Sequence, residues 1–240
     1  MKYLVELGTN IDKEDKNGWT LLLYACQNGY EDIVKYLVEH KADINKNDKN
    51  GNTALMVAYW NENLNLNLIK YLVEHGADIN KGNNDGSTPL YNACKKGHID
   101  MVKYLVEHEA DINKRNNSGC SPLFIACNKG YTTIVKYLVD HGAFTKKEDN
   151  NVYTALYYAC QGGHENIIKY LMEIGTKIDE KKRWTPLFMA CLKGHITVVK
   201  YLVEHGTNID KEDINGRTPL FFACQNGYGK IFTGTQSKCK

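Results

Sequence analysis

Three features that would assign this sequence to a familiar class of protein are missing. It has 30 Lys and Arg against 28 Asp and Glu, so its formal net charge is only +2. That balance leaves no excess positive charge for nucleic acid or an anionic membrane surface. No apolar run is long enough to span a bilayer, and the chain does not open with a secretory leader. We expect a soluble intracellular protein, cytoplasmic with the nucleus as an alternative, that neither binds nucleic acid nor spans a membrane.

The eight cysteines do not form the pattern of a disulfide framework or a zinc site. Six follow an alanine at one recurring position, namely Cys26, Cys94, Cys127, Cys160, Cys191 and Cys224. Stacked helices lie about 8–10 Å apart, whereas a disulfide needs Cα atoms within about 7 Å, so these six thiols are expected to be buried and free. Cys120 and Cys239 lie outside the pattern and are expected to be the exposed thiols. No Cys-x-x-Cys pair or His/Cys cluster suggests zinc, and no cofactor is expected.

The sequence does contain one short segment that is repeated, with seven copies in all. The Lys that opens each copy of this Lys-Tyr-Leu segment falls at positions 2, 35, 70, 103, 136, 169 and 200, a spacing of 31 to 35 residues. A fixed period of about 20–50 residues indicates a repeat array. In such an array each unit buries its apolar stripe against its neighbours and not in one central core.

Each repeat divides into two helices and a polar loop. Thr or Ser before Pro-Leu, as in Thr88-Pro89-Leu90, supplies an N-cap and a proline at the first helical position. The apolar stripe that begins at Ile33-Val34 marks the second helix. We therefore expect helix pairs at 20–28 and 31–40, with equivalents thereafter. Glycine follows most second helices, and where Lys41 and Glu109 replace it the helix ends should be slightly strained.

The order of these motifs resembles the ankyrin repeat. An Asn-Gly turn, Thr-Pro-Leu, Ala-Cys, Gly-His, Ile-Val-Lys-Tyr-Leu and Gly-Ala-Asp-Ile-Asn follow one another from Met1 to about Tyr228. The resemblance implies an all-α solenoid of stacked helix pairs with short β-hairpin fingers. We expect a partial repeat at 1–14, an array at 15–228 and a divergent, disordered tail at 229–240. The array divides into 15–47, 48–82, 83–115, 116–148, 149–179, 180–212 and the incomplete 213–228.

The sequence departs from the family pattern in ways that affect local geometry. The family usually has His after Thr-Pro-Leu, but this chain has Leu23, Met56, Tyr91, Phe124, Tyr157, Phe188 and Phe221. We expect apolar contacts to replace the hydrogen bonds that this His makes between repeats. The segment 60–67 holds two extra residues, the finger at 176–184 is two residues short, and Val152 takes the place of a turn glycine.

Other side chains also recur once per repeat, which favours a structural role over a site. His40, His75, His108, His141 and His205 share one position, and His98, His164 and His195 share another. Metal ligands must converge on one point, so copying explains these ladders better. The tyrosine ladder, which includes Tyr71 and Tyr104, could grip a partner, but packing between second helices with each hydroxyl at the edge is favoured. No phosphate-binding glycine motif or nucleophile with a unique base indicates an enzyme.

Binding information is expected where the copies differ. The residue before the first-helix cap varies most, and residues late in the first helix also vary. The partner-binding candidates are Trp19, Asn52, Ser87, Tyr153, Trp184, Arg217, Trp60, Lys95 and Lys96. Trp19, Tyr153 and Arg217 are the main anchors, because Trp, Tyr and Arg dominate interfaces; drift alone is the alternative explanation of the variety.

The resemblance implies a protein-binding scaffold or adaptor that recognises a partner through finger tips and first helices on the concave face. Its partners would be one or more proteins. An ankyrin fragment of a larger multidomain enzyme or channel, with no catalysis in this chain, is the alternative. A truncated relic without a partner is the third hypothesis.

Overall fold

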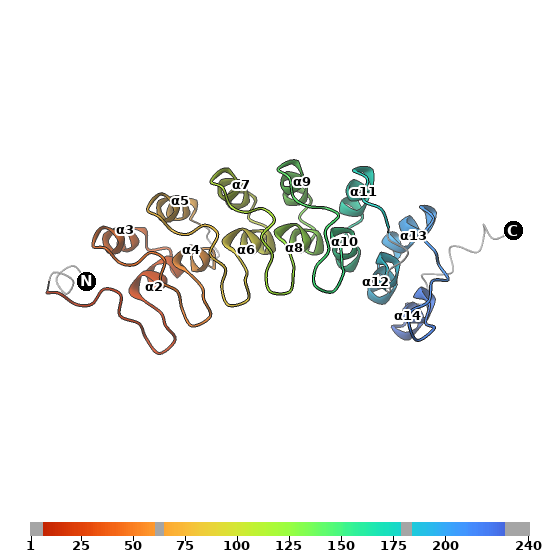
Figure 1. Cartoon of the computed structure of the whole chain (residues 1–240), viewed down its shortest axis with the longest axis horizontal. Helices are drawn as coiled ribbons and strands as arrows, with labels where there is room; N and C mark the ends of the chain where they lie inside the picture. The colour runs from red at the N-terminus through yellow and green to blue at the C-terminus, as the bar shows by residue number, and fades with distance from the viewer. Residues whose placement is uncertain (1–6, 61–64, 179–183, 229–240) are drawn as a thin grey trace. The chain divides into compact units, whose positions relative to one another are not determined.

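The structure is a computed structural model, and it describes residues 7–60, 65–178 and 184–228. Within these ranges the chain forms thirteen helices and no named strand. The helices belong to two compact units, Met1–Ser118 and Gly119–Lys240, which we call the N-terminal and C-terminal units. Each unit is a stack of helix pairs, so the predicted all-α repeat solenoid is confirmed (Figure 1).

The described residues of the N-terminal unit form three helix pairs. Its first helices are α2 (Leu21–Gln27), α4 (Ala54–Val57) and α6 (Pro89–Lys96). Its second helices are α3 (Glu31–Glu39), α5 (Leu66–Glu74) and α7 (Ile99–Glu107). First helices pack on first helices, and each second helix packs on the first helix of its own repeat. The helices expected at 20–28 and 31–40 are therefore confirmed to within a residue at each end.

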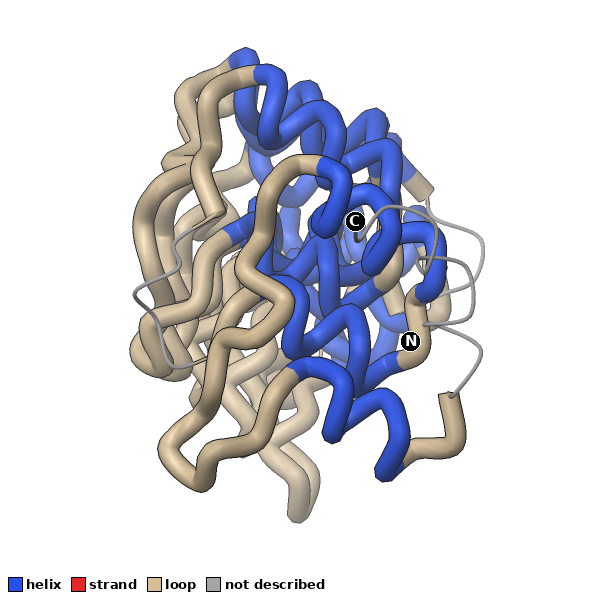
Figure 2. The backbone as a smooth tube through the Cα atoms, turned by 90° about the vertical axis from the view of Figure 1, so that its right-hand side faces the viewer, coloured by secondary structure: helices blue, strands red, loops and turns tan. Residues whose placement is uncertain are grey.

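Within itself, the C-terminal unit has the same arrangement of helix pairs. Its first helices are α8 (Pro122–Lys129), α10 (Ala155–Gly162), α12 (Pro186–Lys193) and α14 (Pro219–Gln225). Its second helices are α9 (Thr132–Asp140), α11 (Glu165–Glu173) and α13 (Ile196–Glu204). The loops that join a second helix to the next first helix project from the helix layers as fingers (Figure 2).

The helix ends follow from local sequence. The hydroxyls of Thr88 and Ser121 accept the backbone N–H three residues later, at 3.1 and 3.4 Å, and proline follows each of them as the first helical residue. Gly97 and Gly130 end the same two helices in the left-handed conformation. Cap, proline and glycine thus fix the helix boundaries before any tertiary contact is considered.

The fingers are tight turns, which corrects the expected β-hairpins. Asp48 Oδ1 accepts the backbone N–H groups of Asn50 and Asn52, at 2.9 and 2.8 Å. Those N–H groups are therefore not available for a strand ladder. In the described part of the chain the pairing is limited to one isolated bridge, between Asn47 and Thr53.

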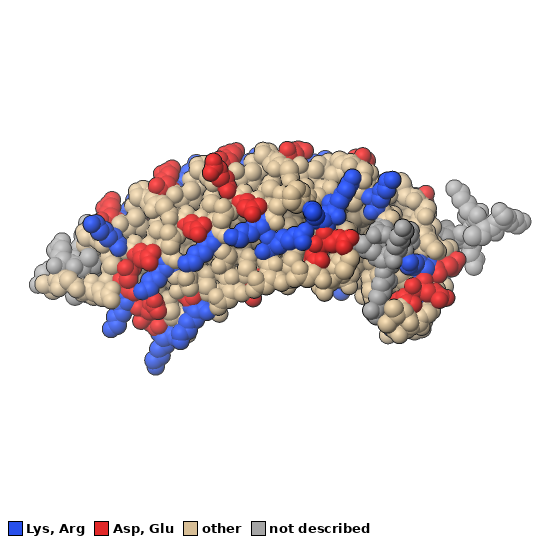
Figure 3. Space-filling view, viewed as in Figure 1, with Lys and Arg blue, Asp and Glu red and all other residues tan. Residues whose placement is uncertain are grey.

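Polar side chains tie successive fingers of the N-terminal unit together. Lys46 Nζ donates to the carbonyl oxygen of Asp12 at 3.1 Å, and Lys81 Nζ donates to that of Asn45 at 2.8 Å. Each lysine therefore reaches back to the preceding repeat. On the face shown in Figure 3, basic and acidic side chains lie beside one another instead of gathering in a patch of one sign. That mixture agrees with the near-zero net charge.

The contacts between repeats are apolar in part. Phe124 and Phe188, which stand where the family has His, are about 1% and 0% exposed. Phe221 at the same repeat position is exposed, and polar ties persist at a different residue: His164 Nε2 donates to the carbonyl oxygen of Asn128 at 2.9 Å. Apolar packing therefore takes the place of the family's hydrogen bonds at Phe124 and Phe188, as expected, while the His of Gly-His supplies hydrogen bonds at another repeat position.

Most cysteines of the described residues lie where the sequence predicted. Cys26, Cys94, Cys127, Cys160 and Cys191 are buried. The prediction was wrong for Cys224, which is exposed, because no described helix follows α14 to cover it. It was also wrong for Cys120, which is half-buried with its Sγ 3.0 Å from the Tyr158 hydroxyl. Cys239 lies outside the described residues.

The tyrosine ladder packs between second helices, but its hydroxyls do not all lie at the edge. Those of Tyr71 and Tyr104 are buried without a hydrogen-bond partner among the described residues. The ammonium of Lys35 lies 5.9 Å from the centre of the Tyr71 ring, and His75 stacks on that ring at 3.9 Å. These neighbours from the same and the preceding repeat cover the ring, which is why the hydroxyl loses contact with water.

Among the described residues, three other than glycine have positive φ, at 66° for Lys41 and Glu109 and 69° for Val152. The strain predicted at the helix ends where Lys41 and Glu109 replace glycine agrees with these angles, and Val152 adopts the same conformation in its turn. The tail at 229–240, for which disorder was expected, lies outside the described residues, as do the centres of the extended 60–67 segment and of the shortened finger. No helix in the described ranges is long and apolar enough to cross a membrane.

Candidate partner-binding surface

The structure brings some of the nine candidates to the surface and buries two. In the N-terminal unit Trp60 and the pair Lys95-Lys96 are exposed, and Trp19 is half-buried. Asn52 and Ser87 are only 6% and 7% exposed. Asn52 donates from both its backbone and its side chain to Asp48, so its polar groups serve the finger itself. Because they are buried, Asn52 and Ser87 are removed from the predicted partner-binding residues and are not part of the surface proposed below.

Three aromatic rings gather at the start of the N-terminal unit. The Trp19 ring lies 5.0 Å from that of Tyr24 and 6.0 Å from that of Trp60, tilted by 45° and 50°. Trp19 reaches them from the base of the first finger, Tyr24 from α2 and Trp60 from beyond α4. Tyr24 and Trp60 are 45% and 39% exposed. The cluster therefore presents aromatic surface to solvent.

Asp15 completes this cluster. Its Oδ1 accepts the Trp19 backbone N–H at 2.8 Å, and its Oδ2 accepts the Tyr24 O–H at 2.9 Å. The bond from Trp19 holds the pKa of Asp15 below its usual range, and the same carboxylate raises the pKa of the Tyr24 hydroxyl. The sequence reading missed Tyr24 and Asp15. The available signal was a tyrosine nine residues after a finger aspartate, which recurs at Asp149 and Tyr158.

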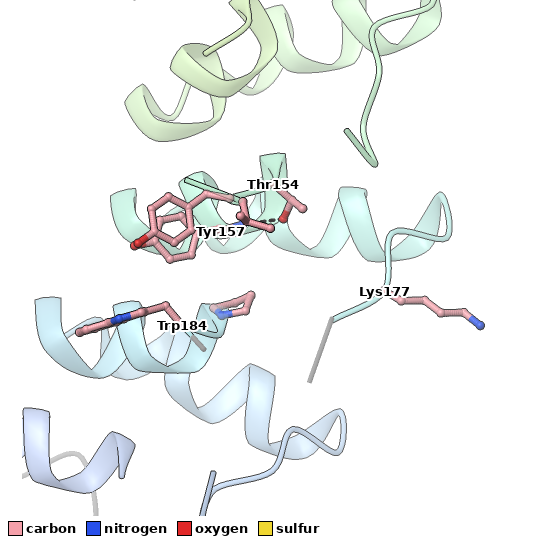
Figure 4. Close-up of a pocket in the computed structure, with 7 residues that line it drawn as sticks. Thr154, Tyr157, Lys177 and Trp184 are labelled. Atoms are coloured by element: carbon pink, nitrogen blue, oxygen red, sulfur yellow. Dashed lines mark hydrogen bonds between the residues drawn. The ribbon is translucent and has the colours of Figure 1, made fainter. Parts of the chain in front are cut away.

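Two further candidates line a small pocket in the C-terminal unit. Tyr153 stacks on Tyr157 with ring centres 3.9 Å apart and planes within 2°. Trp184 lines the same pocket and packs on Phe222 at 5.2 Å. Tyr157 and Trp184 lie across the pocket from each other, whereas the Lys177 side chain extends away from it (Figure 4). The walls are therefore aromatic, and the nearby charge is directed outward.

Arg217 already has partners within its own unit. Its Nε and Nη2 donate to Asp213 Oδ2 at 2.9 and 2.7 Å, and its guanidinium carbon lies 4.7 Å from the centre of the Phe222 ring. The hydrogen bond from Arg217 lowers the pKa of Asp213. This predicted anchor is thus a preorganised, half-buried group with its charge balanced by a neighbour.

One chain of polar groups suggests chemistry but does not activate a nucleophile. Tyr158 donates its O–H to Asp149 Oδ2 at 2.7 Å, and the Cys120 sulfur lies 3.0 Å from the same hydroxyl. Burial raises the pKa of the Cys120 thiol, so the thiol is protonated near neutral pH. Across the described ranges no three His, Cys, Asp or Glu side chains are grouped so that they could hold a metal ion.

The repeat pattern and the stacked helix pairs agree with the comparison against protein families. A model of three ankyrin repeats matches residues 1–83, 47–116, 63–149, 109–182 and 177–233. The chain belongs to the ankyrin-repeat family. A comparison with curated proteins found no match. Ankyrin repeats are generally protein–protein interaction modules and are typically not catalytic.

Proposed function

We propose that this chain is a protein-binding scaffold or adaptor whose partner contacts the fingers and first helices. The observation that carries the proposal is the position of the exposed and half-buried aromatic residues. Trp19, Tyr24 and Trp60 lie together on the finger and first-helix side of one unit, and Tyr153 and Trp184 line a pocket on that side of the other. Buried or half-buried aromatic anchors of this kind carry most of the energy of an interface.

The second helices support the same assignment, because their side chains are repeated and serve packing between repeats. Their repeated tyrosines are used in stacking, since His75 and His108 each lie on the tyrosine four residues earlier, at 3.9 and 4.0 Å. The remaining exposed positions, such as Lys103 and Glu107, carry the same residue types in most copies. Stacking requires identical copies, whereas recognition of a particular partner requires differences.

The proposal is for binding and not for catalysis. The Cys120 thiol lies beside hydrogen-bonded polar groups, but burial raises its pKa and so keeps it protonated near neutral pH. We also propose a reducing, intracellular location, because five cysteines of the described residues are buried as reduced thiols.

The test is capture of a partner followed by a comparison of two surfaces. The immobilised chain is used to retain partners from native extract, and the Kd of a retained protein is measured for Trp184→Ala and Trp60→Ala against Lys103→Ala and Glu107→Ala. Loss of a central aromatic anchor should weaken binding by about 2 kcal/mol, or roughly thirtyfold. The two second-helix variants should bind as the parent does. Losses confined to Lys103 and Glu107 would refute the assignment.

A further inference from the structure

We propose that Asp15, Trp19, Tyr24 and Trp60, which we call the acidic–aromatic cluster, bind an arginine side chain of a partner protein. The inference rests on the proposed function and names the chemistry that one part of its surface recognises. All four residues lie in the N-terminal unit. The Trp19 ring lies next to the rings of Tyr24 and Trp60, and the Asp15 carboxylate binds Trp19 and Tyr24, so the cluster forms a surface suited to a flat cation.

The C-terminal unit supplies an internal precedent. Counted from the Thr caps of α2 and α14, Asp213 and Phe222 occupy the repeat positions of Asp15 and Tyr24. Between this carboxylate and this ring lies the guanidinium of Arg217, 2.7 Å from the carboxylate oxygen and 4.7 Å from the ring centre. The repeat therefore binds a guanidinium at this position when its own sequence provides one.

The N-terminal unit has the same carboxylate and ring without that arginine. Trp19 stands at the repeat position of Arg217, and Trp60 adds a second indole. The carboxylate of Asp15 accepts three hydrogen bonds, from the backbones of Asn17 and Trp19 and from the Tyr24 hydroxyl. A carboxylate has about four lone-pair sites, so one remains for a donor from outside. Asp15 is exposed, and that donor has direct access to it.

The chemistry favours arginine over lysine and over an uncharged ligand. A guanidinium is planar, so it stacks on an indole while its edge donates to a carboxylate, which an ammonium cannot do in the same geometry. Tryptophan is the strongest cation–π partner among the aromatic residues. The hydrogen bond from Tyr24 to Asp15 also adds electron density to the phenol ring, which strengthens its attraction for a cation. Lys49 acts on Asp15 only through its charge and would compete weakly.

The test is an NMR titration of the intact chain with its three tryptophan side chains labelled at the indole nitrogen. The probe is the peptide acetyl-Gly-Gly-Arg-Gly-Gly-amide, and the matched control carries citrulline, which has the shape of arginine without its charge. The indole signals of Trp19 and Trp60 should shift and saturate with the arginine peptide. Apparent affinity for the citrulline peptide should be at least about fivefold lower. Trp184 is an internal control in the other unit and should not move.

Two variants distinguish binding at the acidic–aromatic cluster from general effects on folding. Trp60→Leu leaves the first finger intact and should reduce the shift of Trp19 on arginine binding. Asp15→Asn keeps an acceptor for the finger and should reduce the preference for arginine over citrulline to the part that the aromatic rings supply. Equal affinity for both peptides, or equal shifts at Trp184, would overturn the proposal.

The result also distinguishes this inference from the scaffold proposal. A captured partner that needs Trp19 and Trp60, together with equal binding of both peptides, would overturn arginine recognition and leave the scaffold intact. Selective binding of the arginine peptide would support the cluster even if the captured partner proved to bind the second helices.

Discussion

The Nε2 atom of His195 lies 3.0 Å from the carbonyl oxygen of Gln161, so the start of α13 is tied to the first helix of the preceding repeat. The ring also fills the space beside Gly163, where an added Cβ would meet it. His195→Ala removes this hydrogen bond and leaves a half-buried carbonyl without its donor. We predict a loss of about 1 kcal/mol in the free energy of unfolding, measured by urea denaturation.

His205→Ala is the matched control. The His205 ring donates to the carbonyl oxygen of Tyr201 within the end of its own helix and is exposed. Its removal should cost less than that of His195. An equal or larger loss at His205 would show that the tie between repeats is not what His195 contributes.

Val152 should be replaceable by glycine with a gain in stability. Its φ of 69° lies in the left-handed region, which costs a residue with a Cβ roughly 1–2 kcal/mol. The side chain is 50% exposed, so little packing is lost. Val152→Gly should raise the free energy of unfolding by about 1 kcal/mol after the entropy of the unfolded chain is included.

Lys41→Gly serves as the comparison for Val152→Gly. Lys41 has φ of 66° but is not β-branched, so the gain there should be smaller. Thermal denaturation of both variants measures the two effects. A decrease in stability for Val152→Gly would mean that the valine makes contacts worth more than its strain.

Buried thiols should make the protein sensitive to alkali. Burial raises the pKa of Cys26 from 9.0 to about 12, and that of Cys191 likewise. Above pH 9 the unfolded chain releases these protons while the folded chain retains them. The stability contribution is therefore complete below pH 9 and is lost as the pH rises toward 12.

The measurement for the alkaline effect is the free energy of unfolding at pH 7 to 11 for the parent chain and for Cys26→Ala. The variant lacks one of the thiols and should lose less stability across the upper part of this range. Parallel curves for the two chains would contradict the assignment of alkaline sensitivity to Cys26.

The rate of thiol labelling should decrease as the burial of each cysteine increases. Cys224 is exposed and should react first, Cys120 should react more slowly, and Cys127 and Cys160 should react only on unfolding. Mass spectrometry of labelled peptides reads each site separately. Labelling of Cys127 at the rate of Cys224 in the native protein would refute the packing of the first helices.

Much of the fold was predictable because its signals are local. The Thr88 cap, the proline that follows and Gly97 fix the bounds of α6 within a single stretch of sequence. The burial of Cys127 was predictable because its position recurs in a stacked repeat. The strain at Lys41 was predictable because most other repeats have glycine at the equivalent position.

What the sequence could not predict depends on neighbours from other repeats. Cys224 occupies the same repeat position as Cys127, but the described residues place no further helix over it. Asn52 stands at the most varied position and was expected to bind a partner, yet its side chain turns inward to Asp48. The Tyr24–Asp15 bond joins residues nine apart through the shape of the finger, which period and composition do not specify.

The most direct test of the account is site-specific photo-cross-linking at Trp60 and Lys103. Both side chains are exposed and both lie in the N-terminal unit, but the first belongs to the varied first-helix side and the second to the repeated second-helix side. Each is replaced in turn by a photoreactive phenylalanine, and the chain is irradiated in native extract. The account predicts a cross-linked partner from position 60 and none from position 103. A partner cross-linked from position 103 alone would contradict it.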